Sequence, residues 1–251
     1  MVPCAVDLPS RALNPPWRAR RHNAYSPATQ RVRFQFALCD CPLRYPLKKP
    51  FTHRETIFLR RVKETWVPER EGENYREAAR QLTAEFAQTE WGLKLRCTAI
   101  DRRVIAAHEK QWRPAFRIFR ERKGVARGDE SWDWFELVWG NRNKTTRLEA
   151  AFWCDDALVG LVIGRRSPGR TRVSIHRLAA SPVHSHPAKG LVTPLAIALG
   201  TYTGLAYGAG ELRILEPLPA VVGIYTQNGL TPDAVGGIVR YCYKSLQEVV
   251  W

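Results

Sequence analysis

The sequence predicts an α/β fold in which a mixed central sheet is flanked by helices. From residue 93 onward, stretches that alternate between apolar and polar residues, typical of strands, are interspersed with stretches whose apolar residues recur at three- and four-residue steps, typical of helices. In chain order these stretches read β-α-α-β-β-β-α-β-α-β, which indicates a layered α/β domain. Apolar residues make up 45% of the 251 residues and charged residues 25%, values that exclude a wholly disordered or collagen-like chain.

Residues 1–92 are predicted to form a basic N-terminal extension that is partly disordered. The first 63 residues hold 13 basic and 3 acidic side chains, and five prolines stand among the arginines of the first thirty. Such a composition stays poorly ordered unless a partner fixes it. Two strand-like runs follow, at residues 31–38 and 56–59, and the prolines between them forbid a tight hairpin.

A helix is predicted near residues 75–90, with Asn74 as its N-cap. Its apolar residues fall on one stripe: Tyr75, Ala78, Ala79, Leu82 and Phe86. The pattern changes character at Leu93, and a second domain is therefore predicted over residues 93–251.

This second domain opens with a strand over residues 93–99 and a long helix. Asp101 can cap the start of that helix and Gly124 can close its end, while Pro114 is expected to kink it. Residues 131–139 then form a short, aromatic-rich helix. Three strands come next, over residues 148–153 and 158–165, joined by an Asp-Asp turn, and over residues 171–179.

The stretch from Gly190 to Gly210 carries no charge and is long enough to cross a bilayer. Its proline, five glycines and polar residues are a poor composition for a membrane span, and a buried helix over residues 193–208 is predicted instead. Thr193 is the expected N-cap, Pro194 the first helical residue and Gly210 the end. The last elements are a strand over 211–215, a helix over 220–228 and a strand over 238–246.

Residues 93–251 resemble the GNAT superfamily of N-acetyltransferases, most specifically between Ile175 and Leu230. The run Ile175–Pro182 is similar to that family's central strand, which ends in Leu-Ala-Val-x-Pro. The run His186–Val192 stands where the family keeps its Arg/Gln-x-x-Gly-x-Gly/Ala coenzyme A loop, and Tyr225–Leu230 resembles the family's Tyr-x-x-x-Gly-Phe helix ending. The resemblance implies a GNAT-like mixed sheet and acetyl-CoA as co-substrate.

A coenzyme A diphosphate suits the start of the predicted helix, because the first turn of a helix leaves N–H groups unpaired and its dipole favours an anion. Gly190 allows close backbone approach and Lys189 adds a positive charge. The chain departs from the family pattern at Pro187 and Val192, so a plain strand-loop-helix crossover is the alternative interpretation of the loop. The cofactor-binding residues implied by the resemblance are Leu178, Ala179, Ala180, Lys189, Gly190, Leu191, Val192 and Thr193.

Acyl transfer needs a base for the amine and an acid for the departing sulfur, and four residues are candidates for these roles. The resemblance implies Tyr225 as the acid, against the alternative of a half-buried packing residue. Glu216, after the strand 211–215, and His176, on the central strand, are the candidate bases, and Glu149 is a weaker one. The alternative interpretations are a surface acid for Glu216, a core histidine for His176 and an exposed strand residue for Glu149.

The predicted function is that of an acetyl-CoA-dependent N-acyltransferase. Its acceptor could be a protein, an aminoacyl-tRNA, a nucleobase or a small amine. The alternative is a non-catalytic, basic nucleic-acid-binding module on a degenerate GNAT fold, motivated by the imperfect loop at residues 187–192.

Composition adds expectations about partners and compartment. The net charge of +15 and a pI of about 10 suit a polyanionic partner such as nucleic acid or tRNA. The six cysteines lack the paired spacing of a zinc site, and His184 and His186 are thin evidence for a metal, so no metal is predicted. Without an export signal the chain is expected to be cytoplasmic, with no membrane partner and with a homodimer left open.

Overall fold

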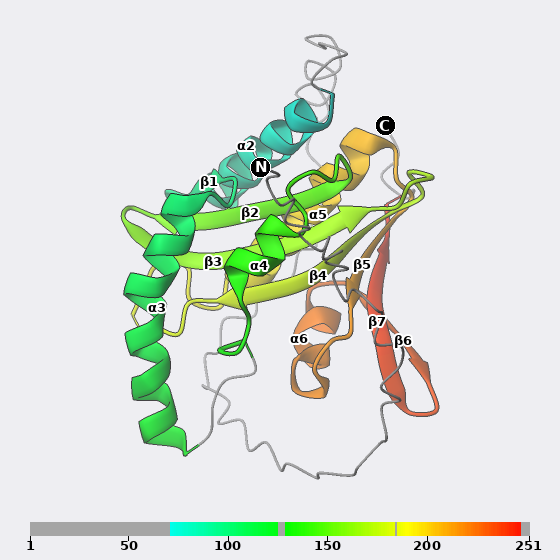
Figure 1. The fold of residues 1–251 in the computed structure, drawn as a ribbon. Helices are drawn as coiled ribbons and strands as arrows, with labels where there is room; N and C mark the ends of the chain where they lie inside the picture. The colour runs from blue at the N-terminus through cyan, green and yellow to red at the C-terminus, as the bar shows by residue number, and fades with distance from the viewer. Residues whose placement is uncertain (1–70, 125–128, 184, 247–251) are drawn as a thin grey trace, which may run out of the picture. The chain divides into compact units, whose positions relative to one another are not determined.

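A seven-stranded mixed sheet runs through the computed structural model, which describes residues 71–124, 129–183 and 185–246 (Figure 1). The strand order is β1-β2-β3-β4-β5-β7-β6, and every neighbouring pair is antiparallel except β4 and β5, which are parallel. The predicted α/β fold with a mixed sheet is thereby confirmed. The strands are β1 Arg96–Thr98, β2 Arg147–Cys154, β3 Ala157–Arg166, β4 Arg172–Ala180, β5 Glu211–Leu215, β6 Thr231–Val235 and β7 Ile238–Ser245. The strand-like runs expected at residues 31–38 and 56–59, and the basic arm around them, lie outside the described residues.

Helices cover both faces of this sheet. Helices α2 and α5 pack on one face together with α6, and α3 and α4 lie on the other (Figure 1). The helices are α2 Glu71–Trp91, α3 Arg102–Lys123, α4 Trp134–Trp139, α5 Val192–Tyr207 and α6 Val222–Gln227, the last preceded by the 3₁₀ turn Pro219–Val221.

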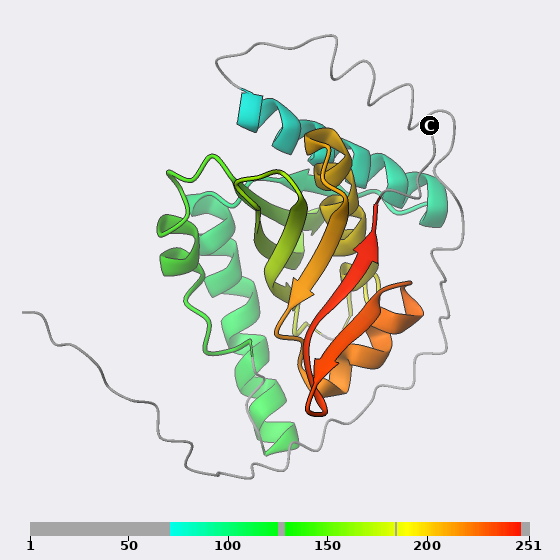
Figure 2. The same ribbon diagram turned by 90° about the vertical axis from the view of Figure 1, so that its right-hand side faces the viewer.

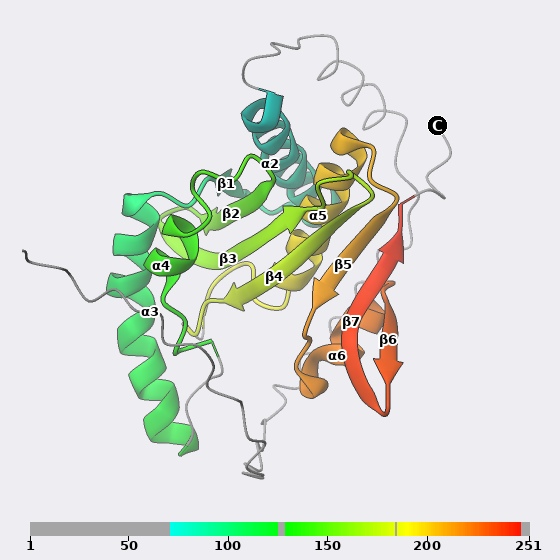
Figure 3. The same ribbon diagram turned by 45° about the vertical axis from the view of Figure 1, so that its right-hand side comes forward.

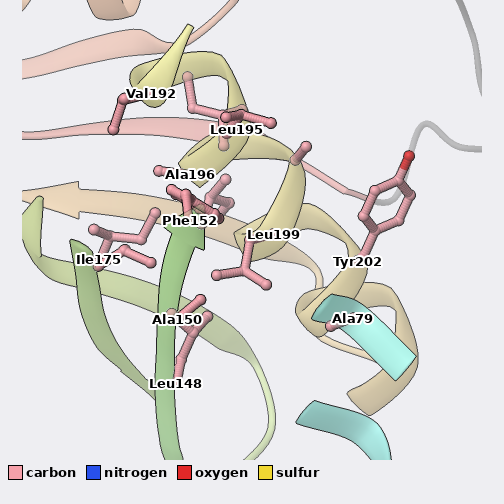
Figure 4. Close-up of a cluster of buried hydrophobic side chains, with 14 of the residues drawn as sticks. Ala79, Leu148, Ala150, Phe152, Ile175, Val192, Leu195, Ala196, Leu199 and Tyr202 are labelled. Carbon is pink, nitrogen blue, oxygen red and sulfur yellow. The ribbon is translucent and has the colours of Figure 1, made fainter. Parts of the chain in front are cut away.

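The main core forms around α5, the uncharged helix. Figure 4 shows its residues Val192, Leu195 and Leu199 among apolar side chains of the sheet, including Phe152 and Ile175. Because helix α5 is apolar on every side, it needs neighbours on every side, as a buried helix does. Within the described ranges no helix combines the length and apolar character needed to cross a membrane.

Helix α2 supplies a second layer over α5. Its residues Ala79, Leu82 and Ala87 are buried in the same core as α5, and the Tyr202 ring of α5 meets the Phe86 ring of α2 at 6.4 Å between centroids. The predicted division of the chain at residue 92 therefore falls between two elements that share one core.

Helix α3 begins and ends where the sequence predicts. The Asp101 carboxylate accepts the Val104 N–H at 2.9 Å, and Gly124 closes the helix in the left-handed conformation with φ of 69°. The helix runs on through Pro114, where a kink was expected, and Pro114 lies on the exposed side. On that side the carbonyl that loses its helical partner can face water.

The ends of helix α5 differ from the prediction. Thr193 is not the N-cap, because the preceding turn already brings Leu191 into helical geometry (φ −96°, ψ −11°) and the helix begins at Val192. Pro194 is consequently the third helical residue rather than the first. The helix ends at Gly208 in a left-handed conformation, two residues before the predicted Gly210.

Strand β6 is missing from the prediction. It pairs with β7 through the two-residue turn Gly236–Gly237, whose φ values of 60° and 79° fit a type I′ hairpin turn. The Gly-Gly pair was a usable signal for this hairpin. Pro232 obscured it, although an edge strand tolerates proline.

Candidate functional site

The candidate site is the gap where β4 and β5 part. The two strands pair only from Arg172 with Glu211 to Ile175 with Ile214, and the rest of β4 has no partner on that side among the described residues. Figure 3 shows the two strands side by side at one end and separating toward their carboxyl ends. In parallel sheets this end of the strands is where ligands commonly bind.

A bulge in β4 marks the point of parting. On the β3 side, Ile163 faces Arg177 and Gly164 faces Ile175, so His176 is the extra, unpaired residue. A bulge bends its strand and increases the local twist, which accounts for the separation of β4 from β5. The sequence identified His176 as a candidate but did not reveal the bulge.

The neighbouring Gly164 permits this geometry. A Cβ at Gly164 would overlap the Ser174 carbonyl oxygen and lie 3.1 Å from the Ile175 Cα. Any larger residue would therefore force β3 and β4 apart at the bulge. The glycine keeps the strands close where the register shifts.

Backbone groups of β4 point into the gap. The Ser181 N–H donates to the Val159 carbonyl across the β3 side at 2.9 Å. Because N–H groups alternate between the two sides of an antiparallel strand, Arg177 and Ala179 direct theirs toward β3, whereas Leu178 and Ala180 direct theirs toward the open side. Within the predicted segment Leu178–Ala180, the Leu178 N–H is thus directed into the gap, where it can meet a ligand oxygen.

The start of helix α5 lies beside the same end of β4. Gly160 pairs with Ala180, and a Cβ on Gly160 would lie 2.7 Å from the Val192 side chain. The turn before the helix is held by bonds from Lys189 N–H to His186 O and from Leu191 N–H to Ala188 O, at 3.2 and 3.0 Å.

Donors are available at this helix start. The N–H groups of Gly190, Val192 and Thr193 donate to no backbone carbonyl within the described part of the chain. Gly190 has φ of 80° and open space where a side chain would be, and Lys189 is half-buried. Pro194 removes one N–H from this turn. The residues present therefore fit a diphosphate, with fewer donors than a loop without that proline.

His176 and Glu216 come together at the mouth of the gap. Arg177 links them, because it lies 3.8 Å from the Glu216 carboxylate and donates to the His176 carbonyl at 2.8 Å. Glu216 adopts φ of 49°, a left-handed conformation that is uncommon for a side-chain-bearing residue and typical of functional or strained positions. Its carboxylate is 81% exposed, and its N–H donates to the Arg240 carbonyl at 2.9 Å.

The His176 imidazole is kept neutral at pH 7. Burial lowers its pKa below the ordinary 6.5, Arg165, Arg177 and Lys144 lower it further, and only Glu216 opposes them. Its Nε2 is buried without a hydrogen-bond partner in the described structure. A neutral imidazole can accept a proton, as a base must. Arg177 directly follows His176 in the chain, but Arg165 and Lys144 come from other segments and become its neighbours only in the folded chain, so the sequence did not identify them.

Tyr225 lies in the core. Its ring belongs to the same buried cluster as Ile214 and Cys242 and is 8% exposed. Burial, with a further contribution from Cys242, raises the pKa of its hydroxyl to about 12. Tyr225 therefore keeps its proton throughout the neutral range, which an acid requires, and it also packs as the alternative interpretation expected.

A buried carboxylate and a cavity, either of which could belong to a site, both lie away from the candidate residues of the gap. Glu149 is buried beside Arg147, with Nε and Oε1 at 3.2 Å, and burial raises its pKa, which marks it as part of an ion cluster with Arg76 and Arg80 of α2. A cavity of about 390 Å³ lies beside α2 and β1 and contains none of the candidate residues. Within the described ranges no three His, Cys, Asp or Glu side chains gather as metal ligands would.

The topology confirms the predicted mixed central sheet flanked by helices, with one parallel pair at its centre and a crossover helix starting beside the gap. No family model and no curated protein matches the chain in sequence. Solved structures with a similar arrangement include the Paia N-acetyltransferase of Thermoplasma acidophilum in complex with coenzyme A, 12% identical over 61% of this chain and 99% of that chain, with a TM-score of 0.44.

An acetyltransferase from Thermus thermophilus is 13% identical over 60% of this chain and 96% of that chain, also with a TM-score of 0.44. The aminoglycoside 6'-acetyltransferase type Ii is 17% identical over the same shares of the two chains, with a TM-score of 0.41. Proteins this distant in sequence can differ in acceptor and activity, so the likeness extends to the fold alone.

Proposed function

We propose that the protein transfers an acyl group from a coenzyme A thioester to an amine. The observation that carries this proposal is the gap between β4 and β5, with the Leu178 N–H directed into it and the start of helix α5 beside it. When bound, the thioester supplies an activated acyl carbon, whose bond to sulfur is exchanged for a bond to the amine nitrogen.

Residues at the helix start would hold the diphosphate. The N–H groups of Val192 and Thr193, the helix dipole and the Lys189 ammonium all favour an anion at that place. The open space beside Gly190 leaves the backbone accessible.

Residues of β4 and the β5 end would serve the reacting groups. The Leu178 N–H can donate to the thioester oxygen, where negative charge develops, as backbone donors do in oxyanion holes. His176, whose lowered pKa favours the neutral imidazole, is the group that can accept the proton of the amine, and Glu216 can attract the amine to the mouth of the gap. The Tyr225 hydroxyl remains the candidate donor to the departing sulfur.

Isothermal titration with acetyl-CoA tests the proposal. We expect saturable binding that Lys189→Glu weakens about 10-fold, because a charge next to the diphosphate is reversed. Lys110→Glu is the matched control, since Lys110 is exposed on α3 and far along the chain from the loop. If the wild-type protein binds neither acetyl-CoA nor coenzyme A, the acyltransferase proposal fails and the non-catalytic binding module is favoured.

The chemistry has its own test once a panel of amines reveals an acceptor. His176→Gln should lower kcat by about 100-fold or more while leaving acetyl-CoA affinity unchanged, because a general base contributes about that factor. A parallel loss in Tyr225→Phe would assign the acid. An unchanged kcat in His176→Gln would show that the base lies elsewhere.

A further inference from the structure

Next to the proposed site, the part of the sheet formed by β5 and β7 has a helix over only one of its two faces among the described residues. Along β5, Leu212 and Ile214 are buried toward α5, whereas Glu211, Arg213 and Leu215 are half-exposed on the opposite face. Figure 2 shows α5 and α6 to one side of β5 and β7, with α3 and α4 on the other side nearer the β2 edge. No helix of the described residues covers β5 and β7 on the α4 side.

Aromatic rings and guanidinium groups alternate on this open face. Tyr241 and Tyr243 lie two residues apart on β7 and face the same way, with ring centroids 6.1 Å apart. The Arg213 guanidinium lies over the Tyr241 ring at 4.2 Å. Across the gap, the Arg177 guanidinium lies 5.4 Å from the Trp132 ring. The two sides of the gap thus present the same combination of ring and cation.

The open face is also predominantly positive. Strand pairing puts Arg165, Arg172 and Arg213 on the same face as Arg177, and Arg165 and Arg172 are exposed. The acids among them are Glu211, which is paired with Arg213, Glu216, which is near Arg177, and Asp233, which lies opposite Tyr241 and is paired with Arg240. The exposed arginines Arg165 and Arg172 therefore keep their charge available for a phosphate.

We propose that this face, defined by Trp132, Arg165, Arg172, Arg177, Arg213, Tyr241 and Tyr243 and called here the open sheet face, binds single-stranded nucleic acid. Bases would stack on Tyr241 and Tyr243, and phosphates would meet the exposed arginines. An acidic protein could pair with the arginines, but it would offer no bases to stack on the tyrosine rings. If the proposed acyl transfer holds, the bound nucleic acid carries the acceptor amine to Glu216. This delivery of the amine is the only part of the inference that rests on the proposed function.

Fluorescence anisotropy with a labelled 12-nucleotide RNA of mixed sequence tests the open sheet face. The double variant Tyr241→Val and Tyr243→Val should bind the RNA about 10- to 100-fold more weakly, since stacking on each ring is lost. Valine suits a strand, so the fold is expected to persist, and circular dichroism and acetyl-CoA titration on the same samples verify it.

The matched control is a second exposed aromatic pair. Phe135 and Trp139 stack at 5.6 Å on α4, with Arg142 over Trp139, and both rings are about half exposed. The double variant Phe135→Leu and Trp139→Leu should leave RNA affinity within twofold. A rigid duplex of the same charge should compete less well than the single strand, because its bases are not free to stack.

Three outcomes would overturn the inference. They are no RNA binding by the wild-type protein, equal losses in the tyrosine and the α4 variants, and equal competition by polyglutamate with no effect of the tyrosine changes, which would indicate an acidic protein partner. The two proposals fail separately. Acetyl-CoA binding without RNA binding overturns only the open sheet face, and RNA binding without acetyl-CoA binding overturns only the acyltransferase.

Discussion

The bulge at His176 depends on Gly164, which has a hydrogen atom where every other residue has a Cβ. Gly164→Ala would press a Cβ against the Ser174 carbonyl, which belongs to a fixed strand and cannot swing away. We expect a loss of about 3 kcal/mol in the free energy of unfolding, measured by urea denaturation, because an overpacked backbone contact has to be relieved by moving β3 from β4.

The control for this substitution is Gly223→Ala on helix α6, where nothing lies within 4 Å of the added Cβ. That change should be neutral or stabilising by up to about 1 kcal/mol, because alanine favours a helix more than glycine does. Equal stability of both variants would mean that the strands at the bulge can move apart freely.

His108 predicts how stability depends on pH. It is 4% exposed among Trp112, Phe116 and Trp134, and burial lowers its pKa below 6.5 although Glu109 and Asp129 act in the opposite direction. As pH falls, the unfolded chain therefore takes up this proton before the folded chain does. Stability is full above pH 6.5 and declines below it, by up to about 1.4 kcal/mol per pH unit for one proton.

The substitution His108→Gln should remove this part of the decline. The difference in unfolding free energy between wild type and variant should be constant above pH 7.5 and should shrink steadily toward pH 5. Chemical denaturation at several pH values measures it. A difference that does not change with pH would show that His108 titrates alike in the folded and unfolded chain.

At the scale of single residues, the sequence predicted identities better than surroundings. His176, on the central strand, and Glu216, after the strand 211–215, could be chosen because their residue types and their places suit a base. Arg177 is next to His176 in the chain, but the cations Lys144 and Arg165 around His176 could not be predicted, since they come from two other segments. Tyr225 was placed on the correct helix, but its depth in the core depends on the packing of Ile214 and Cys242, which no local pattern records.

Among the elements, helix α3 has a cap whose contribution can be measured. Asp101→Ala removes the bond to the Val104 N–H and should lower the free energy of unfolding by about 1 kcal/mol in urea denaturation. Asp156→Ala removes the same charge from an exposed turn residue and should change stability by less than about 0.5 kcal/mol. Equal effects would assign the loss to net charge rather than to the cap.

Periodicity predicted which elements exist, and less reliably where they end. Strand β5 and helix α3 match their predicted ranges because clear alternation and good caps bound them. Helix α5 was given the wrong ends because its start is set by the turn at residues 187–191 and not by a capping side chain. The bulge in β4 left no trace in the sequence, since it arises from register against β3.

For the molecule as a whole, the shared core of α2 and α5 makes a prediction about cooperativity. Leu82 of α2 is 2% exposed, and Leu82→Ala should destabilise by about 3 kcal/mol. Because α2 packs into the sheet's core, tryptophan fluorescence and far-ultraviolet circular dichroism should report one transition at a lower urea concentration. Two separate transitions would show that α2 unfolds independently of residues 93–246.

The position of helix α5 in the chain has a consequence for synthesis on the ribosome. Helix α2 and strands β2, β3 and β4 have all been translated by the time the uncharged α5 segment emerges, so most of its partners are already waiting. The buried core residues still to come are Ala209, Leu212, Ile214, Tyr225, Leu230, Cys242 and Leu246. The apolar α5 segment therefore waits only a short time for the rest of its core to be translated, roughly two to eight seconds at ordinary elongation rates. During this interval it is exposed to other nascent chains.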